Sequence, residues 1–371
     1  MKLIGVGFVG AGWMGRALLE KVHARSDTVI RKLCGRDRTR GQAILAELEL
    51  PDDGFTERFE DLIEDPAIDA IFICSPNGYH GSQAIAALQA GKHVFCEKPC
   101  ATRYSEAIKQ IELAHTHPQL ITLVDYILHF DTMEQRLRQM VAEDTFGTIS
   151  QIQVNYRHPI NITGEKKWKL DGSLMGDAIG MGIIHALSVM VNVMKPQAKP
   201  VRVYATSQAA RVRAFEQPAI WSIQVTFDNG ASGFCFGNID TANGYDAYHS
   251  ISGTKGGYLF DSLLDRPQKI RMWREGEADG KWIYPLDADR CTTQGVLPWP
   301  DDTTTPDSGD VIEHQTGEVV AHFFDCIRDG VQSPLSFVNS ANIADVGWAA
   351  LVSAKTGQPV DLPFTAGDQL D

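Results

Sequence analysis

The lysine of the segment HVFCEKPCAT (residues 93–102) is the first side chain whose surroundings indicate chemistry. Lys98 lies between Glu97 and Pro99. A buried lysine with a lowered pKa can relay a proton, and a charged one can donate a hydrogen bond to a substrate oxygen. A lysine at a strand end is more commonly solvent-exposed, but a following proline restricts the backbone and can hold a cis turn. We therefore expect Lys98 to be functional, with Glu97 anchoring the turn or the lysine.

The histidine of GSLMGDAIGMGIIHALSVM (residues 172–190) is a second candidate for chemistry. Acid/base chemistry needs a positioned group that can accept a proton near neutral pH. Histidine suits proton removal, because its ordinary pKa of about 6.5 is close to neutral pH. On the residues alone, His185 could equally be a buried histidine whose hydrogen bonds are satisfied on an apolar helix.

The cysteines beside Lys98 do not predict a metal or redox site. Cys96 and Cys100 have no second thiol pair nearby, and no histidines stand at ligand spacing. The seven cysteines are scattered and odd in number, which is more typical of a reducing cytoplasm than of a disulfide scaffold. We expect a cytoplasmic protein without a metal ion.

A glycine-rich loop near the start of the chain predicts dinucleotide binding. Residues 10–15 (GAGWMG) form a G-x-G-x-x-G that ends an apolar run and begins a helical one. In this setting Gly10 makes the tight turn, Gly12 lets the backbone approach a pyrophosphate, and Gly15 lets the helix pack on its strand. The helix N-terminus then faces the phosphate charge.

The choice between NAD and NADP depends on the segment CGRDRTR (residues 34–40). Asp37 follows Gly15 by 22 residues, close to the position of a carboxylate that binds the ribose 2′-hydroxyl of NAD. Arg36 is adjacent and could instead bind the 2′-phosphate of NADP. We favour NAD, since a carboxylate here would repel that phosphate, and keep NADP as the alternative.

The elements that position these residues alternate through the first third of the chain. The predicted strands are residues 3–9, 28–34, 70–76, 93–97 and 120–126, and the predicted helices are 13–24, 39–48, 80–91 and 105–115. Repeated βα units with continuously apolar strands predict a parallel sheet covered on both faces. We assign residues 1–124 to a doubly wound dinucleotide-binding domain.

The pattern changes near Gly147, where strand-like runs with turn signals replace the alternation. The predicted sheet segments are residues 149–158, 200–208, 219–238 and 248–261, followed by a Thr/Asp/Pro-rich loop at 292–310 and helices at 316–330 and 340–357. The sequence therefore predicts an α/β protein whose residues 125–371 form an α+β domain with a large, open, mixed or antiparallel sheet. Its last helix is expected to pack back on the first domain.

Composition and charge restrict the class of partner. The chain has 371 residues, enough for two domains, and a net charge of −13, which argues against a nucleic-acid surface. No apolar run approaches the roughly 20 residues of a membrane helix. The start MKLIGVGFVG becomes glycine-rich too early for a signal peptide. We expect a small-molecule substrate and neither nucleic acid nor membrane as a partner.

Three motifs together resemble a known family. They are the E-K-P tripeptide at residues 97–99, the glycine loop at 10–15 and the segment SPNGYH at 75–80. The chain resembles the Gfo/Idh/MocA oxidoreductases, which include inositol and sugar dehydrogenases, over nearly its whole length. The resemblance implies that Lys98 lies at the active site, with the nicotinamide end of the cofactor beside residues 75–77. It also implies self-association as a homodimer or homotetramer. The expected cofactor contacts are Gly10, Gly12, Trp13, Met14, Gly15, Arg36, Asp37, Ser75, Pro76, Asn77, His80 and Glu97.

The resemblance also makes His185 the acid/base, with one departure. Inositol-type members carry an aspartate four residues before this histidine, whereas this chain has Met181 there. The nearest carboxylate is Asp177, eight residues before His185 and about 12 Å away along a regular helix. Asp177 could therefore bind substrate but could not orient His185 directly.

Polar residues with aromatic neighbours are the expected substrate contacts of a polyol site. The candidates are Tyr126, His158, Trp168, Asp171, Asp177, Tyr245 and His249. Asp171 and Asp177 rank highest because they flank the turn before His185, and Ala178 leaves room at the pocket wall. The expected function is NAD(P)-dependent oxidation of a ring hydroxyl of an inositol or a pyranose sugar. The alternatives are an NADPH-dependent reductase of the same fold and a dinucleotide-sensing regulator without catalysis.

Overall fold

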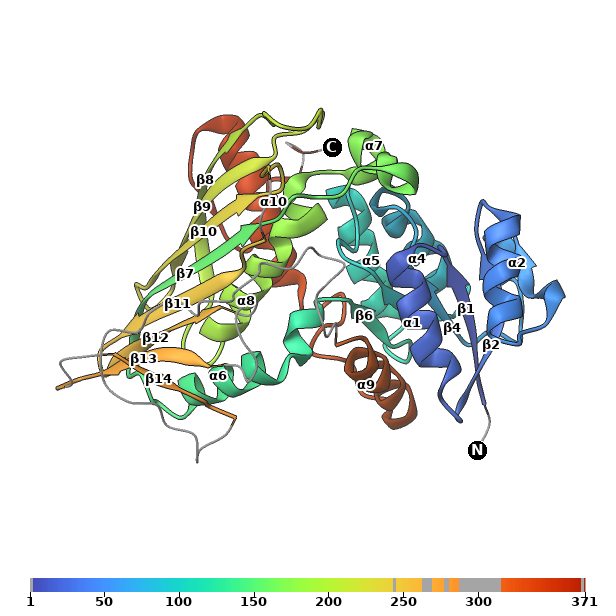
Figure 1. The fold of residues 1–371 in the computed structure, drawn as a ribbon, viewed down its shortest axis with the longest axis horizontal. Coiled ribbons are helices and arrows are strands. Elements are labelled where there is room, and N and C mark those ends of the chain that lie inside the picture. The colour runs from blue at the N-terminus through green and yellow to red at the C-terminus, as the bar shows by residue number, and fades with distance from the viewer. Residues whose placement is uncertain are drawn as a thin grey trace.

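The computed structural model describes residues 3–242, 245–261, 269–276, 280–286 and 315–367, and residue 370. The chain forms two sheets, one in each half, with helices between them (Figure 1). The loop expected at residues 292–310 lies outside the described residues. None of the described helices has the length and hydrophobicity needed to cross a membrane.

The first sheet is the predicted parallel one. Its described strands run in the order β3-β2-β1-β4-β5-β6. The strands are β1 (Ile4–Val9), β2 (Thr28–Cys34), β3 (Phe55–Thr56), β4 (Ala70–Ile73), β5 (His93–Cys96) and β6 (Thr122–Val124). The central strands read as unbroken apolar runs because helices cover both of their faces. Between β1 and β4 the strand order reverses, which is where an open α/β sheet forms its binding crevice.

The helices of this half follow the strands as the alternation predicted, and this fold class is confirmed. They are α1 (Trp13–His23), α2 (Arg38–Glu47), α3 (Glu60–Ile63), α4 (His80–Gln89) and α5 (Tyr104–Thr116). The sequence did not predict β3, because two residues are too few to show a hydrophobic period.

The register of the first sheet brings four chain segments to one edge. Val9 pairs with Ile73, Ile73 with Cys96, and Cys96 with Val124, so these strands end level with one another. The glycine loop, the 75–80 segment, the E-K-P tripeptide and residue 125 each follow one of those strand ends. Residues far apart in sequence therefore meet at the carboxyl edge of the sheet.

The second sheet is mixed, as predicted, and its described strands number nine in the order β14-β13-β12-β11-β7-β10-β9-β8-β15. Its strands are β7 (Ile149–Arg157), β8 (Pro200–Gln208), β9 (Ile220–Phe227), β10 (Ser232–Asn238), β11 (Tyr248–Gly253), β12 (Gly256–Asp261), β13 (Ile270–Arg274), β14 (Lys281–Ile283) and β15 (Val360–Asp361). β7 is parallel to β10 and antiparallel to β11. Alternating buried and exposed positions along β9 show that only one face of this sheet is covered.

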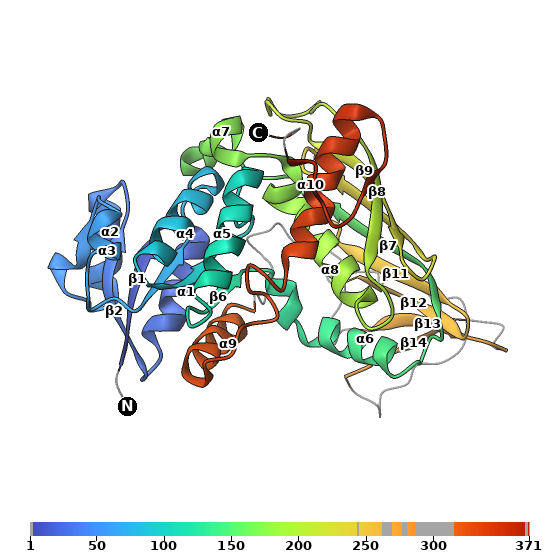
Figure 2. The ribbon, with the colours of Figure 1, turned by 180° about the vertical axis from the view of Figure 1, so that it is seen from behind.

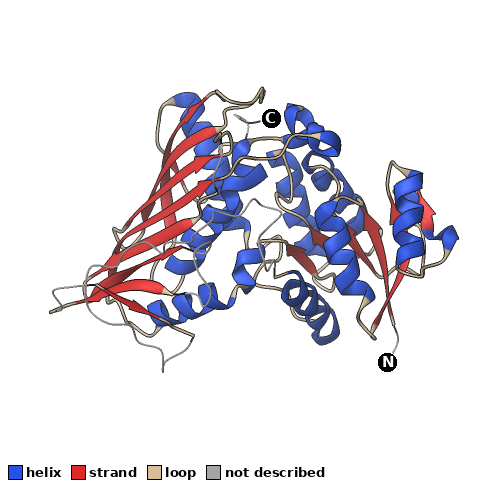
Figure 3. Ribbon diagram, viewed as in Figure 1, coloured by secondary structure: helices blue, strands red, loops and turns tan. Residues whose placement is uncertain are grey.

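Three helices cover that face and separate the second sheet from the first (Figure 3). They are α6 (Thr132–Ala142), α8 (Ile184–Met194) and α10 (Ala341–Thr356). α8 contacts β7 and α10 contacts β8. The helix α9 (Thr316–Asp329) instead returns to the first sheet beside α1 (Figure 2). There Phe323 packs edge-on against Phe72 and Phe95.

The segment before His185 differs from the regular helix on which its expected geometry depended. A short helix, α7 (Gly172–Met175), ends at Gly176, whose φ is +78°. A π-helical turn, Ile179–Ile183, follows and leads into α8. A π-helical turn loosens the hydrogen-bond ladder and often marks a functional position in a helix. The 12 Å estimate between Asp177 and His185 therefore does not apply.

Candidate active site

A single cavity joins the carboxyl edge of the first sheet to the covered face of the second. Its volume is about 760 Å³, within the range of small-molecule and cofactor sites. The glycine loop lines one end, Lys98 and Glu97 line the middle, and His185 on α8 lines the opposite wall. Sequence reasoning placed these residues in one site, and all of them border this cavity.

The three loop glycines have the surroundings that a bound dinucleotide requires. Gly10 has φ of +97°, and a Cβ there would lie 2.3 Å from the oxygen of Cys74. A Cβ on Gly12 would meet nothing within 4 Å, so its backbone faces open space. A Cβ on Gly15 would lie 2.2 Å from the oxygen of Gly10, which shows how closely α1 packs on the loop. The residues present therefore fit a pyrophosphate at the N-terminus of α1.

Both residues expected to select the cofactor lie at the same end of the cavity. Arg36 and Asp37 line it, as do Trp13 and Met14 of the loop. Asp37 is also the N-cap of α2, and its Oδ1 accepts a hydrogen bond from the backbone N–H of Arg40. The helix cap thus fixes the orientation of the aspartate at this end of the cavity.

The 75–80 segment is held against the E-K-P turn by the ring of His80. The two ring nitrogens lie 2.7 Å from the carbonyl oxygens of Ser75 and of Pro99. Asn77 is buried, and its Nδ2 donates to the oxygen of Met175 at 2.9 Å. These bonds tie β4, β5 and α7 together at the cavity. Ser75, Pro76, Asn77 and His80 all line it.

Lys98 reaches across the cavity from the first sheet to the π-helical turn. Its Nζ donates a hydrogen bond to the main-chain oxygen of Met181 at 2.7 Å. Burial lowers the pKa of the Lys98 amine, and the nearby Glu97 and Asp125 carboxyls oppose that shift. The Lys98–Pro99 peptide bond is cis. The ammonium is therefore anchored one helical turn before His185.

Two buried carboxyl groups lie behind this lysine. Glu97 follows β5 and Asp125 follows β6, and their side chains hydrogen-bond each other. Burial raises the pKa of both, and the charge of Glu97 raises the pKa of Asp125 further, well above its usual range. Two carboxyls can form such a bond only if one of them holds a proton. We assign that proton to Asp125, which leaves Glu97 as the anion beside Lys98.

His185 stands in a group of aromatic rings on the wall formed by the second sheet. The ring of Tyr156 lies 6.0 Å from that of His185 and 5.8 Å from that of Tyr245, and the ring of His158 lies 4.4 Å from that of Tyr245. His158 is only 5% exposed and lines the cavity. These rings present a surface that is apolar on its faces and polar at its edges, which suits a hydroxylated ring.

The 3-10 segment Gly164–Leu170, between β7 and α7, forms a further wall of the cavity. Trp168 and Lys169 line the cavity, and the Lys169 Nζ lies 5.9 Å from the centroid of the Trp168 ring. Burial, together with the charge of Lys98, lowers the pKa of Lys169 to about 7. At the other end of the segment, Glu165 pairs with Arg40. The segment thus spans the cavity from α2 to the lysine end.

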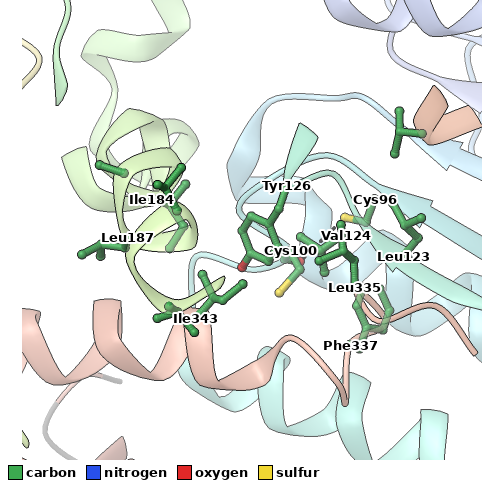
Figure 4. Close-up of a cluster of buried hydrophobic side chains, with 14 of the residues drawn as sticks. Cys96, Cys100, Leu123, Val124, Tyr126, Ile184, Leu187, Leu335, Phe337 and Ile343 are labelled. Carbon is green, nitrogen blue, oxygen red and sulfur yellow. Dashed lines mark hydrogen bonds between the residues drawn. The ribbon is translucent and has the colours of Figure 1, made fainter. Parts of the chain in front are cut away.

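Three of the expected substrate residues do not line the cavity. Asp171 caps α7 by accepting from the backbone N–H of Ser173. Asp177 is bound to the N–H of Gly180 at 2.8 Å and thereby holds the π-helical turn. Tyr126 lies in the apolar cluster of Figure 4, with Cys100 and Val124 beside it and α8 opposite. The carboxyl groups of Asp171 and Asp177 thus serve the framework around the site, and Tyr126 packs in the core. His249, by contrast, lines the cavity beyond His185.

Family models match both halves of the chain. Residues 4–125 match the oxidoreductase family with an NAD-binding Rossmann fold, GFO_IDH_MocA. Residues 135–259 match the GFO/IDH/MocA C-terminal domain. The chain belongs to the Gfo/Idh/MocA oxidoreductase family. Its first domain is thus an NAD-binding Rossmann domain, in agreement with the geometry of the glycine loop.

Named relatives of this Gfo/Idh/MocA protein are distant. The uncharacterized oxidoreductase YrbE of Bacillus subtilis is 27% identical over 73% of this chain and 77% of its own. Inositol 2-dehydrogenase of Salmonella typhimurium is 25% identical over 67% of this chain and 71% of its own. Among solved structures, levoglucosan dehydrogenase in complex with NADH has a TM-score of 0.78 at 20% identity, covering 98% of this chain and all of that one. That structural likeness shows the shared fold.

Among the cavity-lining residues that sequence reasoning did not single out are Asp125, Tyr156 and Lys169. The position directly after a parallel strand often contributes to a binding site, so the place of Asp125 after β6 could have marked it as a candidate. Tyr156 lies within a predicted strand, and the sequence does not show on which face of the sheet its side chain lies. Among the described residues, no cluster of three or more His, Cys, Asp or Glu side chains could hold a metal ion.

Proposed function

We propose that this protein oxidises a ring hydroxyl of a cyclic polyol or a pyranose sugar, giving an inosose or a lactone, with NAD as the hydride acceptor. The observation that carries the proposal is that Lys98 and His185 border the same cavity as the glycine loop. A hydride acceptor, a proton acceptor and a cationic hydrogen-bond donor are the three parts that the reaction needs. The nicotinamide, when bound, supplies the first of these.

Lys98 is the donor to the substrate oxygen. Its ammonium already holds one hydrogen bond to the Met181 oxygen, which fixes its direction and leaves two N–H groups for other acceptors. Desolvation strengthens its interaction with a developing alkoxide, because few water molecules screen the charge. The Glu97 carboxylate beside it raises the pKa of the amine and so opposes the effect of burial.

His185 is the proton acceptor in this proposal. It lies one helical turn after Met181, on the wall opposite the Lys98 backbone, so that a hydroxyl between the two side chains meets both a donor and a base. The aromatic rings of Tyr156 and Tyr245 flank the same position. His158 and Trp168 are the other proposed substrate contacts, and both line the cavity.

The experiment is a turnover assay with a substrate panel. Protein is mixed with NAD or NADP and with myo-inositol, scyllo-inositol, glucose, galactose or xylose, and absorbance of the reduced nicotinamide is followed. The proposal predicts a signal with at least one polyol or sugar, larger with NAD than with NADP. Tight NAD binding without turnover of any polyol or sugar would contradict it and favour a dinucleotide-sensing regulator.

A further inference from the structure

The cavity continues past His185, away from the glycine loop, into a region that the reaction above does not use. This region lies between α6 and β11, beside the second turn of α8. The cavity-lining residues in and around these elements are partly apolar and partly polar, and include Leu128, Glu134, Val154, Ala186, Val189 and His249. Glu134 is the distinctive member, because its side chain is only 4% exposed and yet borders a cavity.

Hydrogen bonds connect Tyr258, His249 and Glu134 in this region. Nε2 of His249 lies 2.9 Å from Oε1 of Glu134, and because an ionised carboxylate oxygen can only accept, the ring nitrogen is the donor. The hydroxyl of Tyr258 lies 3.1 Å from Nδ1 on the other side of the same ring. The tyrosine thus holds the histidine ring, and the histidine fixes one oxygen of the carboxylate.

The other oxygen of this carboxylate has no hydrogen-bond partner among the residues that the structure describes. Oε2 of Glu134 is buried, and buried carboxylate oxygens are rarely left without a donor. Leaving such an acceptor unsatisfied costs the desolvation free energy of the group, which is larger for a charged oxygen than for a neutral one. A donor is therefore missing at a point where the cavity gives a ligand access.

The hydrogen bonds at the start of α6 do not use the Glu134 side chain, although the charge of Arg138 lies near enough to interact with it. Asp131 is the N-cap of α6, and its Oδ1 accepts from the backbone N–H of Glu134. In a capping box, the glutamate three residues after the cap would bond the cap's own N–H. Here that N–H of Asp131 donates to the oxygen of Leu128 instead. The Glu134 carboxylate is left to face His249 and the cavity.

We propose that Glu134 is a second substrate-binding position, which accepts a hydrogen bond from a hydroxyl on a unit attached to the reacting ring. The substrate would then be a glycoside or disaccharide rather than a free single-ring polyol. This inference rests on the proposed function, since it assumes that the reacting ring lies between Lys98 and His185.

The spacing of His185 and Val189 along α8 leaves room for a second sugar unit. Val189, which borders this region, lies four residues after His185, or about 6 Å along the helix axis. The apolar side chains of Val154, Ala186 and Val189 line the cavity as well and can pack against the face of a sugar ring. A ring at Lys98 and His185 therefore leaves the Glu134 end of the cavity for a further group.

The test compares one-ring and two-ring substrates that share the reacting ring. The pairs are glucose with maltose, glucose with cellobiose, and myo-inositol with galactinol, each assayed with the full chain and NAD. The key variant is Glu134→Gln, whose amide oxygen can still accept from His249 while an NH2 group replaces Oε2. Glu143→Gln is the matched control, because Glu143 follows the same helix and pairs with Arg136 at the surface.

The proposal predicts that kcat/KM for one two-ring substrate exceeds that for its one-ring partner by tenfold or more. Glu134→Gln should lower this value at least tenfold, mainly through KM, while changing one-ring turnover less than twofold. Glu143→Gln should change neither. An equal loss on both substrate classes, or no preference of the wild-type protein for any two-ring substrate, would overturn the proposal.

Two further measurements test the second binding position independently of folding defects and of catalytic turnover. Thermal unfolding of Glu134→Gln with NAD present checks that the variant folds, and a Tm close to that of the wild-type protein is expected. Calorimetric titration of maltose and glucose into the NAD-loaded protein measures binding without turnover. Binding of maltose that weakens in Glu134→Gln would support the second position even if no polyol is oxidised. Failure of the proposed function is thereby distinguished from failure of this inference.

Discussion

Lys98 Nζ donates a hydrogen bond to the main-chain oxygen of Met181 at 2.7 Å. The acceptor belongs to the backbone of a π-helical turn, at the position where the family resemblance led us to expect an aspartate. The lysine is thus held by a carbonyl that this loosened turn supplies, and the side chain of residue 181 is not needed for the bond. The structure in this way accommodates the departure from the inositol-type pattern.

The geometry of the turn, rather than the side chain at 181, should therefore control activity. A Cβ on Gly180 would lie 2.9 Å from Cγ of Pro99, so Gly180→Ala has to move the turn away from the E-K-P segment. We expect kcat of Gly180→Ala to fall about tenfold or more, since small misplacements of catalytic groups are costly. Met181→Leu keeps the carbonyl and the volume, so its kcat should stay within about threefold of the wild-type value. The reverse order of the two effects would contradict the role of the carbonyl.

The Glu97 carboxylate should set the alkaline limit of the pH profile. Desolvation lowers the pKa of Lys98, and Glu97 is the first group that raises it again. Glu97→Gln removes that opposing charge, so the pKa of Lys98 falls further and the protonated amine is lost at a lower pH. We expect the alkaline limb of kcat/KM to move down by about one pH unit.

The neighbouring carboxyl provides the matched control for this shift. Asp125→Asn replaces the protonated partner of Glu97 with a neutral donor of similar shape and removes only the smaller of the two effects that raise the Lys98 pKa, so the alkaline limb should move less than in Glu97→Gln. A profile unchanged in Glu97→Gln, or shifted equally in Asp125→Asn, would mean that the proton is not distributed between the two carboxyls as we assign it.

Asp37 should determine the preference for NAD over NADP. Asp37→Asn keeps a side chain that caps α2 well but removes the charge that would repel a 2′-phosphate. We expect the ratio of kcat/KM with NADP to that with NAD to rise at least about tenfold, because like charges in close contact cost several kcal/mol. Asp52→Asn, at an exposed position outside the cavity, serves as the control. An unchanged ratio would show that another group selects the cofactor.

Much of the fold followed from the sequence, because the strands of the first sheet are buried on both faces and read as apolar runs. β2 and β8 begin and end at the predicted residues. The two-residue strand β3 gave no such signal. The irregular turn before His185 was also missed, since apolar residues around His185 fit a regular helix equally well.

The site was only partly predictable, because short motifs are visible in the sequence whereas contacts between distant residues are not. Lys98 and the glycine loop lie in short motifs whose spacing carries the chemistry. Asp171 and Asp177 were ranked highly because of their place in sequence, but local backbone N–H groups bind their carboxylates. Asp125 and Glu134 depend on neighbours distant in the chain, and only the folded structure brings those neighbours to them.

The most direct measurement of the central claim is turnover by Lys98→Ala. We expect kcat/KM to fall about 10²–10⁴-fold, the usual contribution of a positioned acid, base or donor, while NAD affinity stays within about threefold. The fold should be kept, and Lys109→Ala, at an exposed lysine on α5, should be unaffected in every respect. Turnover of Lys98→Ala similar to that of the wild-type protein would contradict the account.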